Sequence, residues 1–285
     1  MDTPLTQARV LELADSLPSF PQVVLDILSS LDDENSGLRT LASHVERDPV
    51  ITAQIFSLVH SAAHHSKAQS APRDAYTAIS LIGLANVRKI VLAHSTINFL
   101  NDLPKTPHRS YFWEHSVAVG VCAQELAHNY LNSSDYALIA GLLHDVGQLW
   151  IATFYPQECQ AIYHAIINQG ISIIDAERAV LHGFDHAMIG EILALHWGLP
   201  SSLAAAIRYH HAPEAGLPDP LVAVTHVAEV ISNALDLTRR KDNQVCVLSE
   251  LACQQLGIDW EDDMSRLFGE IEARTEYACT VFRRP

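Results

Sequence analysis

The sequence predicts an all-α protein, built as a two-lobed helical bundle. Apolar residues recur at the i, i+3, i+4, i+7 spacing of a helix along most of the chain, and no stretch alternates convincingly enough for a strand. Residues of the kinds that begin and end helices also punctuate this pattern. Two runs show the spacing clearly: Leu38, Leu41, Ala42 and Val45, then Ile51, Ile55, Leu58 and Val59.

The ends of several helices can be placed from capping residues. Asp48 followed by Pro49, and Ser134 followed by Asp135, predict helix starts, because a polar cap precedes the first turn and proline fits that turn. Expected helix ends lie at Gly147, at Gly170, at Gly198-Leu199-Pro200 and at Ala212-Pro213.

The helical pattern breaks most clearly over residues 101–110, which contain two prolines and several polar residues. This break predicts an N-terminal helical lobe over residues 1–105 and a second lobe over 106–237. Residues 212–220 read as a surface loop within the second lobe. The more polar tail, residues 238–285, is expected to form one or two peripheral helices packed on the second lobe.

Composition narrows the classes of function. The formal net charge is −15 over 285 residues, and the basic residues form no long stripe, so direct binding of nucleic acid is not expected. No run of about 18 uncharged apolar residues predicts a membrane span. The opening MDTPLTQARV lacks a signal-peptide pattern, so a cytoplasmic location is expected. The five cysteines include no CxxC pair and are expected to be free thiols.

Histidine is unusually frequent, with 16 copies. His144 and Asp145 end the apolar run AGLLHDVG, and His115 lies in the preceding FWEHSVAVG. Other helices offer further candidate ligands: His186, His210, His211 and Glu229. Imidazole and carboxylate together suit transition ions, so one or two ions of Fe, Mn or Zn are the expected cofactors if these side chains meet.

These residues resemble the HD-domain superfamily, whose pattern is H…HD…D. His115, His144 and Asp145 match the first three ligands, whereas Glu229 stands where the superfamily has its final aspartate. His186, His210 and His211 resemble the extra histidines of the two-metal HD-GYP branch. By this resemblance, all seven residues are candidate metal ligands: His115, His144, Asp145, His186, His210, His211 and Glu229.

The N-terminal half points to one subfamily. LPSFPQVVLDILSSL, ERDPVITAQIFSLVHSA and AISLIGLANVRKIVLA resemble the HDOD family, the HD-related output domains, and the likeness spans about residues 15–215. One local difference is His60-Ser61, where members usually read Asn-Ser. The resemblance implies an HD-domain-like C-terminal lobe and a regulatory, largely non-catalytic module of bacterial signal transduction. Its expected partner is a signalling protein or a small ligand; the oligomeric state stays open.

Two departures from the HD-GYP pattern disfavour hydrolysis. Gln148 replaces the lysine of HDIGK, removing a positive charge for a substrate phosphate, and HHAPEAGLPDP lacks the GYP signature. The alternative function is nevertheless a metal-dependent phosphohydrolase, such as a cyclic-dinucleotide phosphodiesterase, in which a metal activates water. A third alternative is a purely structural metal that locks helices together.

Simpler interpretations remain for most of these residues. His144 can be a helix-end histidine satisfied by a carboxylate, and His210 and His211 can form a polar helix end. His60, His64 and His65 are expected to be packing or solvated residues. Trp113, Trp150 and Trp197 either line a ligand pocket or fill the core. Four acids near His186 either orient imidazoles or form a solvated face: Asp175, Glu177, Asp185 and Glu191.

Overall fold

The computed structural model describes residues 5–29, 41–43, 45–47, 51–53, 55, 75–104, 109–131, 135–238, 246–261 and 264–282. Within these residues the protein is all-helical and has no strand, as the sequence predicts. Leu41, Ala42, Val45, Ile51 and Ile55 of the periodic N-terminal runs are buried. The other predictions in this region, at Leu38, Asp48-Pro49, Leu58-Val59, His60, His64 and His65, lie outside the described residues.

The chain divides into two compact units, Phe20–Asn101 and the combination of Met1–Ser19 with Asp102–Pro285. The first contains α2 (Gln22–Ser29), α5 (Ala75–Ile82) and most of α6 (Leu84–Asp102). In that unit Phe20 and Phe99 are buried and pack edge to face, with ring centroids 4.9 Å apart. The sequence had placed residues 1–19 with the N-terminal lobe. Residues 5–19 belong to the other unit instead, because α1 (Gln7–Ala14) buries Val10 and Ala14 and contacts α12 (His186–His196).

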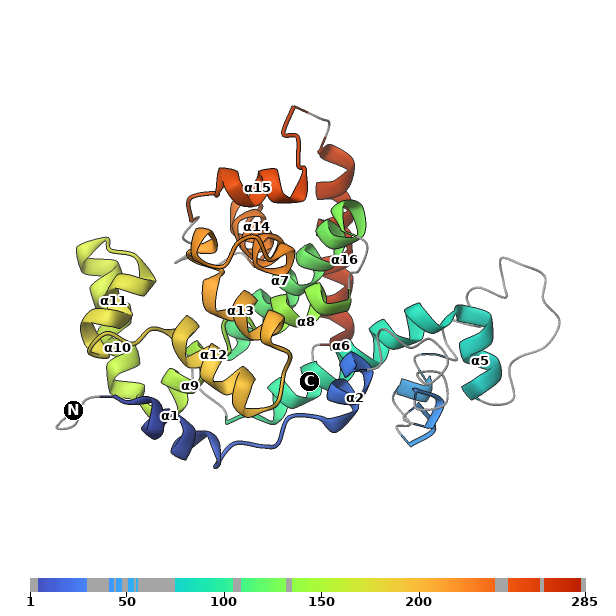
Figure 1. Ribbon diagram of the computed structural model, residues 1–285, viewed down its shortest axis with the longest axis horizontal. Helices are drawn as coiled ribbons and strands as arrows, with labels where there is room; N and C mark the ends of the chain where they lie inside the picture. The colour runs from blue at the N-terminus through green and yellow to red at the C-terminus, as the bar shows by residue number, and fades with distance from the viewer. Residues whose placement is uncertain are drawn as a thin grey trace. The chain divides into compact units, whose positions relative to one another are not determined.

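The larger unit is organised around α14 (Pro220–Ala234), in which every residue from Leu221 to Asn233 is buried. This helix contacts α7 (Arg109–Tyr130), α8 (Asp135–Leu143), α13 (Ser201–Tyr209) and α15 (Glu250–Leu256) (Figure 1). A second contact chain runs from α12 to α9 (Val146–Phe154), then to α10 (Pro156–Gln169) and α11 (Ile173–Val180). α16 (Ser265–Phe282) packs on α7. The candidate ligands therefore lie on or beside the most buried helices.

Helix ends agree with the sequence at two glycines and disagree at a third. Gly170 follows α10 and Gly198 follows α12, both with positive φ. Gly147 was expected to end a helix, and this prediction is wrong because it lies in the first turn of α9. The turn occurs at His144 and Asp145 instead. Gly147 is needed for close packing, since a Cβ atom there would lie 2.0 Å from the carbonyl oxygen of His186.

A second close approach sets the distance between α7 and α8. A Cβ atom on Gly141 would lie 2.6 Å from Cα of Gly120, so the two helices meet backbone to backbone at this point. His115 lies five residues before Gly120 on α7, and His144 comes three residues after Gly141. The two glycines thus allow His115 of α7 and His144, directly after α8, to approach one another.

One stretch of the described chain, Tyr136–Phe154, is long and apolar enough to cross a membrane by composition. It is 78% buried inside the protein. It also contains the turn at His144 and Asp145 between α8 and α9. Such burial is what a core segment of a globular domain shows, so the stretch is weak evidence for a membrane span.

Candidate metal centre

The structure brings all seven candidate ligands together in the larger unit. They come from five places in the chain: α7, the α8–α9 turn, the start of α12, the end of α13, and α14. Six of the seven are at most 5% exposed, and only His211 is half-buried. The convergence that the sequence pattern required is therefore present in the fold.

Asp145 lies between the two groups of candidate ligands and contacts histidines of both. It occupies the cap position before α9, with φ −100° and ψ 11°, yet its side chain makes no capping hydrogen bond. An aspartate at such a position usually accepts a hydrogen bond from a backbone N–H of the first turn. Here the carboxylate reaches the histidines instead, with Oδ2 on the side of His115 and His144 and Oδ1 on the side of His186 and His210.

The first group of ligands, here called the first position, consists of His115, His144, Asp145 and Glu229. Oε2 of Glu229 lies 2.9 Å from Nε2 of His115 and 3.1 Å from Nε2 of His144. Oδ2 of Asp145 lies 3.4 Å from Nε2 of His144 and 3.7 Å from Nε2 of His115. Asn233, one turn further along α14, donates to Oε1 of Glu229 at 2.7 Å and so orients its carboxylate.

The second position consists of Asp145, His186, His210 and His211, whose ligand atoms all lie within 4.8 Å of one another. Oδ1 of Asp145 is 3.1 Å from Nε2 of His186 and 3.6 Å from Nε2 of His210. The Nε2 atoms of His186 and His210 are 3.4 Å apart. Asp145 therefore belongs to both positions and offers one oxygen to each.

Hydrogen bonds behind the rings orient two of the histidines, His144 and His210. Nδ1 of His144 pairs with the carbonyl of Gly141 at 2.8 Å, and Nδ1 of His210 pairs with that of Ile207 at 2.7 Å. Since a carbonyl only accepts, Nδ1 carries the proton in both rings. Each ring therefore presents Nε2 toward the centre. Metal-bound histidines in proteins are typically held in this way by a backbone carbonyl or carboxylate.

Unsatisfied atoms test whether the residues fit a metal. Nε2 of His144, Oδ1 of Asp145 and Oε2 of Glu229 are buried and make no hydrogen bond, although each lies about 3.1 Å from another atom of the centre. Buried polar atoms are rarely left without a partner. Facing lone pairs of nitrogen and oxygen at this spacing repel unless a proton or cation lies between them. The residues thus fit transition ions bound by nitrogen and oxygen.

Electrostatics support the same interpretation. Burial disfavours the charged forms, but the attraction between His144 and the acids outweighs it: the pKa of His144 rises to about 10 and that of Asp145 falls well below its usual value. His115 and His144 likewise lower the pKa of Glu229 despite its burial. Burial lowers the pKa of His210 and His211, where neighbouring imidazolium charges add to the effect. Metal-free, the centre is therefore a mixture of acids, imidazolium ions and neutral imidazoles.

The four acids near His186 have separate roles. Glu177 is buried and accepts from His186, as the orienting interpretation requires. Asp185 caps α12 through the N–H of Met188 and pairs with Arg178 at 2.7 Å. Asp175 accepts from Ser172 on an exposed face, and Glu191 lies 3.4 Å from Arg208. Only Glu177 among the four contacts a candidate ligand directly.

Sequence reasoning missed three contacts of the candidate ligands. Asn233 holds Glu229, and its i+4 spacing on one helix could have revealed it. His226 bonds the carbonyl of His210, and Sγ of Cys246 lies 3.7 Å from Nδ1 of His211. Nothing in the sequence pattern connects these last two pairs, because their partners lie on different elements.

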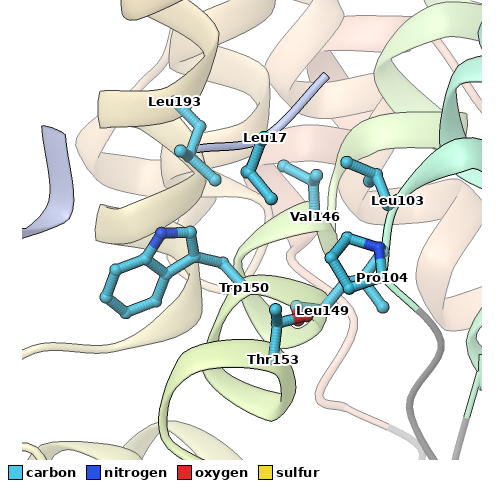
Figure 2. A pocket seen from close by; sticks show the side chains of 8 residues that line it. All are labelled: Leu17, Leu103, Pro104, Val146, Leu149, Trp150, Thr153 and Leu193. Carbon is cyan, nitrogen blue, oxygen red and sulfur yellow. The ribbon is translucent and has the colours of Figure 1, made fainter. Parts of the chain in front are cut away.

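Trp150 lines a small apolar pocket instead of the candidate centre. Figure 2 shows its indole with residues of α9, α12 and the segments after α1 and α6. The pocket lining is Leu17, Leu103, Pro104, Val146, Leu149, Trp150, Thr153 and Leu193. Its volume is about 10 Å³, room for about one water molecule. Trp150 and Trp197 are 2% and 8% exposed and act as core residues.

The solved structures that share the fold include the following three. An HDOD domain protein of unknown function from Geobacter sulfurreducens has TM-score 0.73 and 24% identity, covering 95% of this chain and 98% of that one. A protein from Shewanella amazonensis SB2B, provisionally named a phosphohydrolase, has TM-score 0.64 and 24% identity, covering 94% and 93%. A protein from Marinobacter aquaeolei VT8, provisionally named a signal transduction protein, has TM-score 0.68 and 21% identity, covering 94% and 59%.

The sequence is similar to that of a longer protein and matches one family model. An uncharacterised protein of Treponema pallidum (strain Nichols) is 25% identical over an alignment of 241 residues, which covers 80% of this chain and 44% of the relative. The chain thus spans less than half of that relative's length. The family model of the HDOD domain matches residues 17–213, well over half of the chain. The protein therefore belongs to the HDOD domain family.

Proposed function

We propose that this protein is a non-catalytic signal-transduction module whose metal centre stabilises one conformation of the larger unit. The observation that carries the proposal is the burial of the centre: six of its seven candidate ligands are at most 5% exposed. A phosphate ester could reach them only after the surrounding helices rearranged. The name of the Marinobacter aquaeolei protein, with which this chain shares the fold, agrees with a signalling role.

The chain's own residues account for what such a centre would do. Candidate ligands from α7, the α8–α9 turn, α12, the end of α13 and α14 lie together, so binding one or two ions of Fe, Mn or Zn would join five segments. When bound, a metal ion supplies positive charge between acids and imidazoles that otherwise need protons. Ligand binding to the folded state alone stabilises that state. A signalling protein or small ligand that prefers one state of the unit would then sense metal loading. A cytoplasmic location is part of the proposal.

Hydrolysis of phosphodiesters is the alternative function. The observation that favours it is the position of Asp145, whose two carboxylate oxygens face different groups of candidate ligands, because ions held by both groups would supply positive charge for the oxygens of a phosphate. The provisional name of the Shewanella amazonensis protein belongs to this class. Against it stand the burial of the centre and Gln148, whose neutral amide lacks the charge that would hold a phosphate.

A single assay separates the two functions. The protein, loaded with Mn²⁺ or Fe²⁺ under anaerobic conditions, is mixed with bis-p-nitrophenyl phosphate and, separately, with a cyclic dinucleotide. We expect no turnover above that of Asp145→Asn, together with a higher melting temperature of the loaded protein. Turnover that the Asp145→Asn variant abolishes would refute the non-catalytic proposal and establish the alternative.

A further inference from the structure

His226 is a buried histidine of α14 that lies beside the centre without belonging to it. The residue is 2% exposed and precedes Glu229 by three positions. Both of its ring nitrogens are engaged by the backbone: Nδ1 donates to the carbonyl of His210 at 2.7 Å, and Nε2 accepts from the N–H of Ser249 at 3.0 Å. A ring used on both sides has no lone pair left for a metal ion.

Ser249 extends this contact to two further elements. Its hydroxyl donates to Oε1 of Glu214 at 2.5 Å and accepts from the N–H of Ala252 at 3.2 Å, so it also caps α15. Glu214 lies in the short η1 helix (Pro213–Ala215), four residues after His210. The connection therefore forms a closed ring through His210, His226, Ser249 and Glu214, and back along the chain to His210.

His210 depends on this ring for its orientation. It is the cap residue at the end of α13, where backbone carbonyls lack partners within the helix. Its own Nδ1 donates to the carbonyl of Ile207, so the direction of its imidazole depends on the last turn staying helical. His226 supplies the donor that the buried carbonyl of His210 needs. His211 follows immediately and moves with the same helix end.

We propose that His226 is a positioning residue that holds His210 and His211 in the geometry of the second position, and that Ser249 and Glu214 hold His226 in turn. The inference rests on the proposed metal centre. It predicts an effect confined to the second position, because Glu229 of the first position is held on the same helix by Asn233. These hydrogen bonds would connect α15, which contributes no ligand, to His210 and His211 of the second position.

Two substitutions of His226 separate its two hydrogen bonds. The amide of His226→Asn can place its N–H near Nδ1 of the native ring and keep the bond to His210. The longer amide of His226→Gln reaches the place of Nε2, where it can accept from Ser249 but no longer donates to His210. His226→Leu loses both bonds. His164→Gln, on an exposed face of α10, is the matched control.

Metal content and electron paramagnetic resonance of Mn²⁺-loaded protein give the readout. We expect two spin-coupled ions in the wild type, in His164→Gln and in His226→Asn, where the loss of the bond to Ser249 should weaken the second ion no more than several-fold. We expect one uncoupled ion in His226→Gln and His226→Leu, with the second ion bound about 10–100-fold more weakly. A purely structural role would not let the asparagine variant rescue the coupling while the glutamine variant loses it.

The outcomes distinguish this inference from the proposed centre. Two coupled ions in the wild type and in all three His226 variants would overturn the positioning role alone, whereas a wild type that binds no ions would overturn both. If His226→Leu does not fold, Glu214→Ala provides the second variant, because Glu214 is exposed and its truncation leaves no buried cavity. It should weaken the second ion several-fold, and an unchanged affinity would remove Ser249 and Glu214 from the proposal.

Discussion

A single oxygen atom, Oε2 of Glu177, accepts hydrogen bonds from both the backbone N–H and the ring Nδ1 of His186, at 2.8 and 2.7 Å. The contact fixes the rotamer and the tautomer of the ring together, so that Nε2 faces Asp145. The charge of Glu177 and that of Asp145 also raise the pKa of His186 well above its usual value, against the effect of burial. Glu177 thus orients His186 without itself being a candidate ligand.

Glu177→Gln tests this contact. The neutral amide is a weaker acceptor and leaves the ring less basic, so we expect the second ion to bind about 10–100-fold more weakly, with the first ion unaffected. Asp175→Asn removes the same charge from an exposed position of the same helix and should change neither affinity. Competitive titration with a fluorescent chelator measures both constants. Equal losses for the two variants would show that only the overall charge matters.

Because the centre has two positions, substitutions of Glu229 and of Asp145 should leave different numbers of metal ions per chain. Glu229→Gln removes a ligand of the first position only and should leave about one ion per chain, because Asp145, His186, His210 and His211 remain. Asp145→Asn removes the shared carboxylate and should leave none bound at micromolar metal. Glu191→Gln, paired with Arg208 outside the centre, is the control. Elemental analysis after gel filtration measures the number of ions per chain. One ion bound to Asp145→Asn would contradict the claim that Asp145 is a ligand of both positions.

Metal uptake should release protons. The raised pKa values of His144, about 10, and of His186 mean that both rings are protonated at pH 7 in the metal-free protein, whereas Asp145 and Glu229 are ionised. Metal binding must displace those protons, so we expect release of about two per chain at pH 7. The number should fall as the pH rises through about 10, where His144 loses its proton before the metal binds.

Calorimetric titrations in two buffers of different ionisation enthalpy measure this release at each pH. The same raised pKa values make the stability of the metal-free protein depend on pH. A histidine whose pKa is raised on folding stabilises the metal-free protein fully below its unfolded pKa, near 6.5, and this contribution is lost as the pH rises through about 10. Binding enthalpies independent of the buffer at pH 7 would mean that these histidines are neutral before the metal arrives.

Candidate ligands that belong to one sequence motif could be predicted, whereas contacts between separate elements could not. His115, His144 and Asp145 could be predicted because the HD pattern fixes their types and order, and Glu229 because it replaces an expected acid in the same segment. Gly147 was misinterpreted because a helix-ending glycine and one that permits close packing look the same in sequence. The contacts of His226 and Cys246 could not be predicted, since they join elements that meet only after folding.

A peripheral ion pair stabilises the helix that carries His115. Glu125 of α7 is 2% exposed and pairs with Arg274 of α16, whose side chain is 59% exposed. Arg274→Met leaves a buried acid without its cation, so we expect a loss of about 1–3 kcal/mol in the free energy of unfolding, measured with urea. Arg266→Met, which breaks an exposed pair with Glu270 on the same helix, should cost about 0.5 kcal/mol or less.

A double variant checks the origin of this loss. Adding Glu125→Gln to Arg274→Met removes the buried charge as well, and most of the lost stability should return. If the double variant is as unstable as Arg274→Met alone, apolar contacts of the arginine stem with α7 carry the effect, and the ion pair is not the cause.

The central claim is that acids and imidazoles from five segments form one centre in which Asp145 bridges two metal positions. The most direct test is the electron paramagnetic resonance spectrum of protein loaded with Mn²⁺, measured beside its metal content. Two ions per chain with the exchange-coupled spectrum of a carboxylate-bridged pair are the result we predict. A chain that retains no ion, or holds two ions with uncoupled spectra, would contradict the claim.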